Sequence, residues 1–307
     1  MMKISKIDLF VAFAALLCSC GGNENRIQTT NEETVNSGTA VIICDETIMP
    51  LISAAKPYYD SAFPNAKITL QPANAREAMR QLFSGKTRAI IIARDYLHDE
   101  DSAMQIHNIA KHQRFLFAVD GLVLFARKDF PIDTLSKEQI TAAMNTRLPI
   151  FTQPPSHSEI EPSFAGEIST SSLFGNLMNE FSGGKPVTRP MKFFATADSV
   201  AEYVKSTNGA IGFGYMSKFG RDTTVKLIRI GFSDSTGKRV YPQTVHPGNI
   251  VRGKYPFSVN YYGYLLEDRM NLPWGFFTFM RTDKRVQQSF LNAGIAPAFA
   301  KLELIEQ

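Results

Sequence analysis

The polar residues best placed to do chemistry stand at the expected starts of helices. Thr47 and Asn74 each precede an apolar pattern of helical spacing, and Ser169-Thr170-Ser171 opens a third. A helix N-terminus presents unpaired backbone N–H groups and a partial positive charge, so it can bind a phosphate, sulfate or carboxylate group. The same residue types are also the ordinary N-caps of helices. The pattern alone therefore favours simple capping over an anion site.

Two arginines offer a second way to hold an anion. Arg94 follows the apolar run 89–93 at the expected carboxyl end of a buried strand, where open α/β sheets bind ligands. Arg76 lies in the first turn of the helix that Asn74 caps. An arginine can hold an oxyanion with two parallel hydrogen bonds. The alternative is that both arginines are solvated surface charges, or that Arg94 pairs with the nearby carboxylate of Asp95, Asp99 or Glu100.

The first twenty residues have the pattern of an export signal. Two lysines and the apolar run 9–17 precede Leu17-Cys18-Ser19-Cys20, which resembles a bacterial lipobox. The apolar run is too short to span a membrane. We predict a lipoprotein signal peptide over 1–19 and a lipid on the sulfur of Cys20. An ordinary signal peptide with chance cysteines is the alternative.

The remaining chain consists of a short polar segment followed by a longer part with the composition of a globular protein. Residues 20–37 are polar and predict a flexible tether. Cys44 then has no thiol partner, so we expect no disulfide and place Cys44 in the core. The net charge is +4 and the charges are interspersed, which argues against a nucleic-acid surface.

No enzyme signature accompanies these residues. The chain has no nucleophile elbow, no P-loop and no dinucleotide fingerprint. His107 and His112 do not have the helical spacing of a zinc pair. We predict no catalytic residue, no metal site and no cofactor, and a hydrolase with an unfamiliar site is the alternative.

The helices that begin after Thr47 and Asn74 are expected to alternate with buried strands, and these strands would position the helix starts. Apolar strands are expected at 39–44, 67–70 and 88–94, with a helix between each pair. Pro57 is expected to end or kink the first helix. The alternation predicts a parallel sheet covered by helices.

The stretch 115–126 is apolar except for Asp120-Gly121. It predicts a buried strand whose glycine lets another backbone approach closely. Ser136 and Gln139 then form a capping box for a new helix. A chain that crosses from one lobe to another has this pattern, and a single core strand is the alternative.

The rest of the chain continues the alternation. Residues 148–166 are rich in proline and predict a loop. The later elements are expected as helices at 173–181 and after Thr196, strands at 192–195, 210–215 and 255–265, and helices at 274–280 and 283–293.

Four segments together resemble a known family. They are Asp45-Glu-Thr-Ile-Met-Pro-Leu51, Ala118-Val-Asp-Gly-Leu-Val123 with Leu135-Ser136, Asn208-Gly-Ala-Ile-Gly-Phe213, and Tyr255-Pro256. In this order they resemble the phosphate-type substrate-binding proteins of bacterial ABC importers. The resemblance implies a two-lobed α/β fold of the type II periplasmic-binding-protein kind, with a hinge of two crossover strands. The implied lobes are 38–121 with 243–307 (lobe I) and 122–242 (lobe II).

The resemblance also implies an oxyanion, phosphate first, held where the helix starts converge. The implied ligand residues are Thr47, Ile48, Asn74, Ala75, Arg76, Arg94, Ser169, Thr170 and Ser171. At Ala93-Arg94 the best-known members have an Asp that accepts a phosphate proton, whereas Arg94 can only donate, so the identity of the anion stays open.

The implied setting is a monomer held on the periplasmic side or the cell surface by its lipid. Its implied partners are an ABC permease and the membrane, without nucleic acid. A structural or signalling lipoprotein that keeps the fold without a transport ligand is the alternative.

Overall fold

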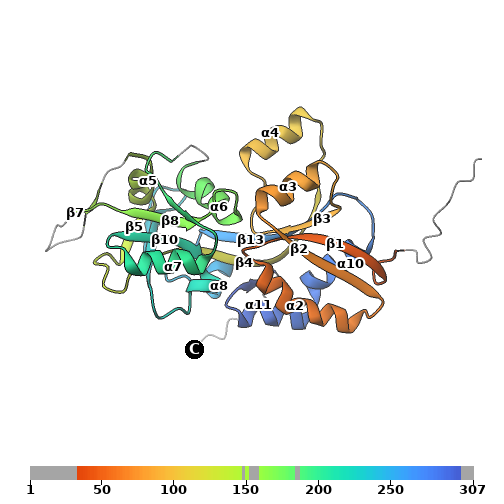
Figure 1. The fold of residues 1–307 in the computed structure, drawn as a ribbon. Coiled ribbons are helices and arrows are strands. Elements are labelled where there is room, and N and C mark those ends of the chain that lie inside the picture. Colours follow the sequence, from red (N-terminus) through yellow and green to blue (C-terminus); the bar gives the residue numbers. More distant parts are fainter. Residues whose placement is uncertain (1–32, 147–148, 152–158, 184–186, 299–307) are drawn as a thin grey trace, which may run out of the picture. The chain divides into compact units, whose positions relative to one another are not determined.

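Helices alternate with strands that join into one mixed sheet (Figure 1). The computed structural model describes residues 33–146, 149–151, 159–183 and 187–298. Neighbouring strands follow the order β2-β1-β3-β13-β4-β10-β8-β9. Their bounds are β1 (Gly38–Asp45), β2 (Ala66–Ala73), β3 (Ala89–Ile92), β4 (Gln113–Ala126), β8 (Ser163–Glu167), β9 (Lys192–Phe194), β10 (Ala210–Tyr215) and β13 (Ser258–Leu265).

Four further strands join this sheet: β5 (Thr134–Ser136), β11 (Lys226–Ser233), β12 (Arg239–Val240) and β14 (Ala296–Pro297). β6 (Ile150–Phe151) and β7 (Glu159–Ile160) pair with each other as a separate two-stranded sheet. The helices are α2 (Met49–Ala62), α3 (Ala75–Phe83), α4 (His98–Ile106), α5 (Lys137–Thr146), α6 (Ser172–Phe181), α7 (Ala197–Ser206), α8 (Met216–Phe219), α9 (Pro247–Val251), α10 (Leu272–Thr282) and α11 (Lys284–Asn292).

Lobe I is built on the expected parallel strands. β1 pairs in parallel with both β2 and β3. Successive side chains of a strand point to opposite faces, so Ile42 packs with the α2 side of the core while Ile43 packs with Met79 of α3. Figure 1 shows α3 on one face of these strands and α2 with α11 on the other. The final helices α10 and α11 both pack against α2.

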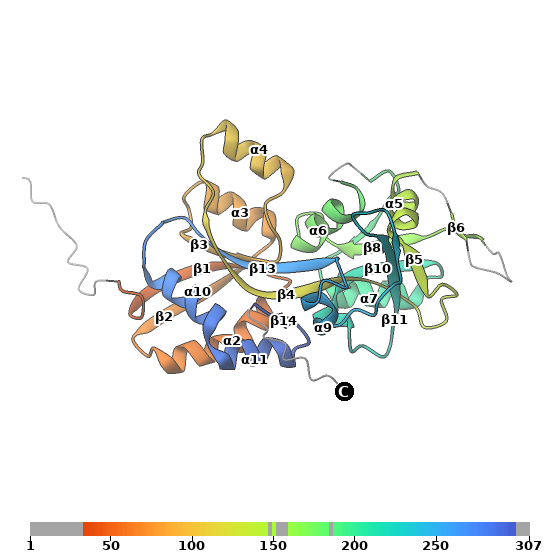
Figure 2. The same ribbon diagram turned by 180° about the vertical axis from the view of Figure 1, so that it is seen from behind.

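Two strands cross between the lobes (Figure 2). β4 pairs with β13 as far as the Gly121–Ser258 pair, and from Leu122 onward it pairs with β10. A side chain at Gly121 would place its Cβ 2.7 Å from a methyl carbon of Val245, so any larger residue there would force the Val245 side chain to move. The break expected at Asp120-Gly121 therefore lies where β4 changes partners. The residue limits of the lobes, 38–121 with 243–307 and 122–242, stay a prediction.

The carboxylate of Asp120 forms hydrogen bonds at the point where β4 and β13 cross between the lobes. It is fully buried, and its Oδ1 accepts hydrogen bonds from the backbone N–H of Gly121 (2.7 Å) and of Ser217 (3.1 Å). Its Oδ2 accepts from the hydroxyl of Tyr261 on β13 at 2.5 Å. One side chain thus joins both crossover strands to α8 of lobe II. Burial raises the pKa of Asp120, and the hydrogen bonds from Ser217, Tyr261 and Gly121 oppose that rise.

One local expectation is confirmed and two are wrong in part; a kink at Pro57 stays a prediction. Ser136 and Gln139 form the capping box, with reciprocal bonds of 3.2 and 2.8 Å. The first helix does not end at Pro57 but runs to Ala62, because Pro57 faces solvent and water can satisfy the carbonyl that its ring leaves unbonded. The expected loop 148–166 contains β6, β7 and most of β8. β8 is specified by its parallel pairing with β10 and not by a local pattern.

We predict that Tyr261→Phe lowers the free energy of unfolding by about 1–3 kcal/mol, because it leaves the buried Oδ2 of Asp120 without a donor. Urea denaturation measures the change. Tyr262→Phe is the matched control on the same strand, since the Tyr262 hydroxyl accepts a bond from the part-buried Asn260 and makes none to a buried carboxylate. An equal cost in both variants would contradict a special role for the Asp120 bond.

Candidate functional site

A pocket of about 320 Å³ lies between the two lobes. We call it the cleft pocket. Lobe I lines it with Asp45, Glu46, Thr47, Pro50 and Asn74, and lobe II lines it with Glu167, Ile168, Ser171, residues 195–198, Tyr215, Ser217 and Lys218. Four helices, α2, α3, α6 and α7, begin at this pocket. Such an arrangement gathers helix N-termini in one place.

Three of these helix starts are capped by side chains. The side-chain Oδ1 of Asn74 accepts from Glu77 N at 3.0 Å, the Ser171 hydroxyl from Phe174 N at 3.2 Å, and the Thr196 hydroxyl from Ser199 N at 3.2 Å. The N-caps expected at Asn74 and Thr196 are confirmed, and Ser171 is the cap within the expected Ser169-Thr170-Ser171 start.

The start of α2 differs from the expectation. The N-cap is Ile48, which is buried, and not Thr47. Thr47 donates its backbone N–H (3.1 Å) and its hydroxyl (3.0 Å) to Oδ1 of Asp45. A threonine that bonds backward in this way cannot cap the helix ahead of it. Its pairing with Asp45 at the end of β1 nevertheless keeps Thr47 at the cleft pocket.

The helix starts of the two lobes contact one another directly. Arg76 N on α3 donates to the carbonyl of Thr170 at 3.1 Å. Beyond it, the Ser172 hydroxyl accepts from Ala93 N at 3.1 Å, and the amide of Asn176 donates to the Ala93 carbonyl at 2.7 Å. The structure thus brings Asn74, Ala75 and Arg76 beside Thr170 and Ser171, although one α3 donor is already bound.

Two buried carboxyl groups line the cleft pocket, and sequence reasoning did not single them out as site residues. Asp45 is fully buried and Glu167 is 7% exposed. Burial, helped by the negative charges of Asp45 and Glu46, raises the pKa of Glu167 to about 7. Burial also raises the pKa of Asp45, while Ser172 and Thr47 beside it oppose the rise. Glu167 was not predicted from the sequence because this residue ends a strand, β8, that no local sequence pattern predicts.

Tyr215 completes this group at the end of β10. Oδ2 of Asp45, Oε2 of Glu167 and the Tyr215 hydroxyl are buried and form no hydrogen bond of ordinary geometry within the described part of the chain. The Asn176 side chain lies near the Tyr215 hydroxyl and opposes the rise that burial causes in its pKa. Unpaired buried polar atoms are rare in folded proteins. The sequence of β10, with glycines at 212 and 214, does not indicate that its last residue, Tyr215, lines a pocket. The three atoms are acceptors available to a ligand.

The cleft pocket has little free positive charge. Lys218 pairs with Asp198 at 2.7 Å, and both side chains are well exposed. Glu46 is exposed at the same pocket. The helix N-termini, rather than arginines, are therefore the groups at this pocket that could attract an anion.

Arg94 does not reach the cleft pocket. It is 1% exposed, and its guanidinium forms two parallel 2.7 Å bonds to the carboxylate of Glu100. Glu100 also accepts from Leu97 N at 3.0 Å, within the first turn of α4. This geometry favours the alternative in which Arg94 pairs with a nearby carboxylate, and its role as a ligand residue stays a prediction.

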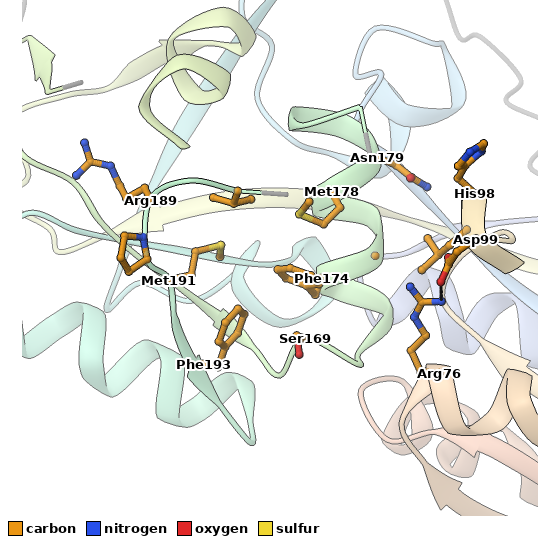
Figure 3. A pocket seen from close by; sticks show the side chains of 14 residues that line it. Arg76, His98, Asp99, Ser169, Phe174, Met178, Asn179, Arg189, Met191 and Phe193 are labelled. Atoms are coloured by element: carbon orange, nitrogen blue, oxygen red, sulfur yellow. Dashed lines mark hydrogen bonds and ion pairs between the residues drawn. The ribbon is translucent and has the colours of Figure 1, made fainter. Parts of the chain in front are cut away.

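Arg76 and Ser169 line a second pocket, of about 700 Å³, beside α6 (Figure 3). We call it the aromatic pocket. Arg76 pairs there with Asp99 at 2.6 Å and is about one-third exposed. The other walls are mainly apolar and come from Leu97, Phe174, Met178, Val187, Met191 and Phe193. The predicted ligand residues therefore divide between two pockets.

The remaining expectations concern metals, thiols and the N-terminus. No cluster of His, Cys, Asp or Glu suited to a metal occurs among the residues described. Cys44 is buried and unpaired, as expected of a core residue. Within the described ranges no helix has the length and apolar character needed to cross a membrane. Cys20, the signal peptide and most of the tether lie outside the described residues.

Comparisons with known proteins bear on the fold. Residues 29–284 match the family model described as PBP superfamily domain. The structure resembles a phosphate ABC transporter substrate-binding protein with bound phosphate from Clostridium perfringens, with a TM-score of 0.66, 15% identity, and coverage of 85% of this chain and 100% of that one. No curated protein sequence matches this chain.

Two further solved structures share the fold. An ABC-type phosphate transport receptor from Vibrio cholerae matches at a TM-score of 0.64 and 14% identity, over 85% of this chain and 100% of that one. The regulatory domain of CcmR from Synechocystis, in complex with 2-PG, matches at a TM-score of 0.53 and 11% identity, over 80% of this chain and 96% of that one. Identities this low establish a common fold and leave the ligand open.

We predict that Arg94→Met lowers the free energy of unfolding by about 1–3 kcal/mol, because the buried carboxylate of Glu100 loses its two 2.7 Å bonds and keeps only the longer ion pair with Arg76 (3.3 Å) and the bond from Leu97 N. The double variant Arg94→Met/Glu100→Gln should recover much of the loss, since the new side-chain amide is neutral and its oxygen can still accept from Leu97 N. Urea denaturation measures both. A stable Arg94→Met protein that binds phosphate tenfold or more weakly would instead identify Arg94 as a ligand residue.

We predict that the free energy of unfolding falls as the pH rises from about 4.5 to about 7. Folded Glu167 keeps its proton up to about pH 7, whereas the unfolded group loses it near 4.5, so the folded chain binds more protons in this window and loses stability as the pH rises. Glu167→Gln should remove roughly 3 kcal/mol of that fall.

Denaturation curves at several pH values test this prediction. Glu202→Gln, a change at an exposed position of α7, is the matched control and should keep the wild-type slope. A Glu167→Gln protein with the same slope as wild type would contradict a raised pKa at Glu167.

Proposed function

The chain belongs to the PBP superfamily domain family, and from this premise we propose that it captures a small oxyanion in the cleft pocket and delivers it to an ABC importer. Phosphate is the first candidate, because the relatives from Clostridium perfringens and Vibrio cholerae are described as phosphate transport proteins. The ligand residues proposed at the cleft pocket are Thr47, Asn74 and Ser171, joined by Thr196.

The convergence of helix starts is the observation that carries this proposal. Helices α2, α3, α6 and α7 each have at least nine residues and begin at the cleft pocket. Each contributes partial positive charge and backbone donors to the same space. An oxyanion placed there interacts with both lobes at once, so its binding would favour closure about the two crossover strands.

The buried carboxyl groups restrict which anion can bind. An ionised carboxylate close to a bare dianion is repulsive. A ligand that brings its own donors avoids this cost, because Asp45 and Glu167 can accept its protons. The pKa of Glu167, about 7, also allows its protonated form to donate to the anion near neutral pH. We therefore favour oxyanions that carry hydrogen-bond donors over sulfate.

A second candidate is a structural or signalling lipoprotein that binds no transport ligand. The contact of Arg76 N with the Thr170 carbonyl favours it, because a donor that could hold an anion is satisfied by the protein itself. The bond from Ala93 N to the Ser172 hydroxyl acts in the same way. Under this hypothesis the lobes hold each other without a ligand.

We also propose that a lipid on Cys20 anchors the protein to a membrane on its periplasmic side or at the cell surface. The support is the lipobox-like Leu17-Cys18-Ser19-Cys20 behind a short apolar run. The polar residues 20–32 would then give the folded part reach from the membrane. The predicted tether 20–37 is too long, because Glu33 pairs with Arg88 at 2.8 Å and accepts a hydrogen bond from Leu272 N. Monomeric state and the permease partner are part of this proposal.

We predict that inorganic phosphate raises the melting temperature of the purified protein, because a ligand that binds only the folded state stabilises it. Ala195→Asp adds a negative charge at an exposed position lining the cleft pocket and should weaken phosphate binding at least tenfold by calorimetry. Ala195→Ser is the matched neutral control. Unchanged affinity in Ala195→Asp would exclude the cleft pocket, and a wild type that binds no anion would favour the second candidate.

We predict that Cys20→Ala releases the protein from the membrane fraction, because the lipid has no sulfur to attach to. Fractionation and intact-mass measurement of wild type and variant test this. Wild type should begin at Cys20 with added acyl mass, and Cys44→Ala, which alters only a buried thiol, should stay with the membrane. A membrane-bound Cys20→Ala protein with an uncleaved N-terminus would contradict lipid anchoring.

A further inference from the structure

The cleft pocket contains more than an anion site requires. At about 320 Å³ it has room for roughly ten waters at about 30 Å³ each, whereas inorganic phosphate has only five heavy atoms. Besides the helix starts, it is lined by Asp45, Glu167 and Tyr215, all at the ends of strands. An inorganic anion at the helix starts would leave part of the space, and these three side chains, without a ligand group.

We propose that the ligand is zwitterionic, and that beside its oxyanion it carries a protonated primary amine which donates hydrogen bonds to Asp45, Glu167 and Tyr215. This inference rests on the proposed function and names the substrate class of that same pocket. Phosphoethanolamine and the short aminoalkylphosphonates have this chemistry.

Unsatisfied acceptors are the first evidence. Asp45 is fully buried, Glu167 is 7% exposed and Tyr215 is 5% exposed. Each presents a buried oxygen that forms no hydrogen bond of ordinary geometry with the described residues, and only the Tyr215 hydroxyl has a side chain, that of Asn176, near enough to lower its pKa. An acceptor left in this state costs about 1–3 kcal/mol, so three of them at one pocket indicate a missing donor. An ammonium group has three N–H donors and no acceptor.

Charge is the second, independent evidence. Asp45, Glu46 and Glu167 contribute acidic groups to the pocket, and the lysine there, Lys218, is paired with Asp198. A negative ligand alone would add to this excess. A ligand with one cationic group offsets it, and an ammonium beside Glu167 would also favour the ionised carboxylate. The oxyanion can then occupy the helix starts.

The two parts of the pocket have opposite electrostatic character. The starts of α3, α6 and α7 at Asn74, Ser171 and Thr196 supply partial positive charge. The strand ends at Asp45 and Glu167 supply carboxyl groups. This separation matches a ligand whose anionic and cationic ends are held apart by a short chain.

Calorimetry of the purified full-length protein tests the inference with three probes. Phosphoethanolamine carries both charges, ethyl phosphate carries the same oxyanion without the amine, and inorganic phosphate carries the oxyanion alone. We expect phosphoethanolamine to bind at least tenfold more tightly than ethyl phosphate. Glu167→Gln should reduce that preference about tenfold or more, while Glu202→Gln should retain it.

Each outcome decides between the proposals. Ethyl phosphate binding as tightly as phosphoethanolamine would overturn the zwitterion and leave the oxyanion-binding function standing. An undiminished preference in folded Glu167→Gln would also overturn it, and Tyr215→Phe provides the same test should Glu167→Gln fail to fold. A wild type that binds none of the three probes would overturn the proposed function itself, and this inference with it.

Discussion

The buried carboxylate of Asp120 is the interaction on which the arrangement of the two lobes depends. An unpaired charge in the interior would be costly, and this one is retained because three donors from three elements surround it. Gly121 N, Ser217 N and the Tyr261 hydroxyl come from β4, the start of α8 and β13. The same residue therefore fixes where β4 changes partners and how α8 joins the crossing.

The cleft pocket follows from this crossing. Ser217 binds Asp120 through its backbone and also lines the pocket, and Tyr215, two residues earlier, ends the strand that pairs with β4 after the crossing. On the other side, β1 ends at Asp45, from which Thr47 is held in place. Because strands from both lobes end at the cleft pocket, the helices α2, α3, α6 and α7 begin around it. A change at the crossing would alter the spacing of the helix starts.

Local signals in the sequence predicted the fold well where the deciding interactions are local. The capping box at Ser136–Gln139, the N-caps at Asn74 and Thr196, and the break at Asp120-Gly121 depend on residues close in the chain. The expectation that the first helix ends at Pro57 was wrong because a solvent-facing proline costs a helix less than a buried one. β8 was missed because its strand conformation comes from pairing with β10, which is distant in sequence.

The chemistry of the site was harder to predict because it is set by tertiary contacts. Arg94 follows an apolar strand, as a ligand-binding arginine would, yet the first turn of α4 brings Glu100 against it. Glu167 ends a strand, β8, that the sequence pattern does not predict. Its burial beside Asp45 therefore could not be predicted either. Thr47 was expected to cap α2, but the carboxylate two residues before it competes for its donors. The helix starts were predictable singly, whereas the carboxyl groups between them were not.

The central claim is that a ligand oxyanion occupies the space where the helices of both lobes begin. A crystal structure of the protein grown with inorganic phosphate tests this most directly. We expect tetrahedral density within hydrogen-bond distance of the backbone N–H groups at the starts of α6 and α7, in the pocket that Ser171 and Thr196 line. Density confined to the aromatic pocket beside Phe174 and Met178, or a cleft pocket holding only water at saturating phosphate, would contradict it.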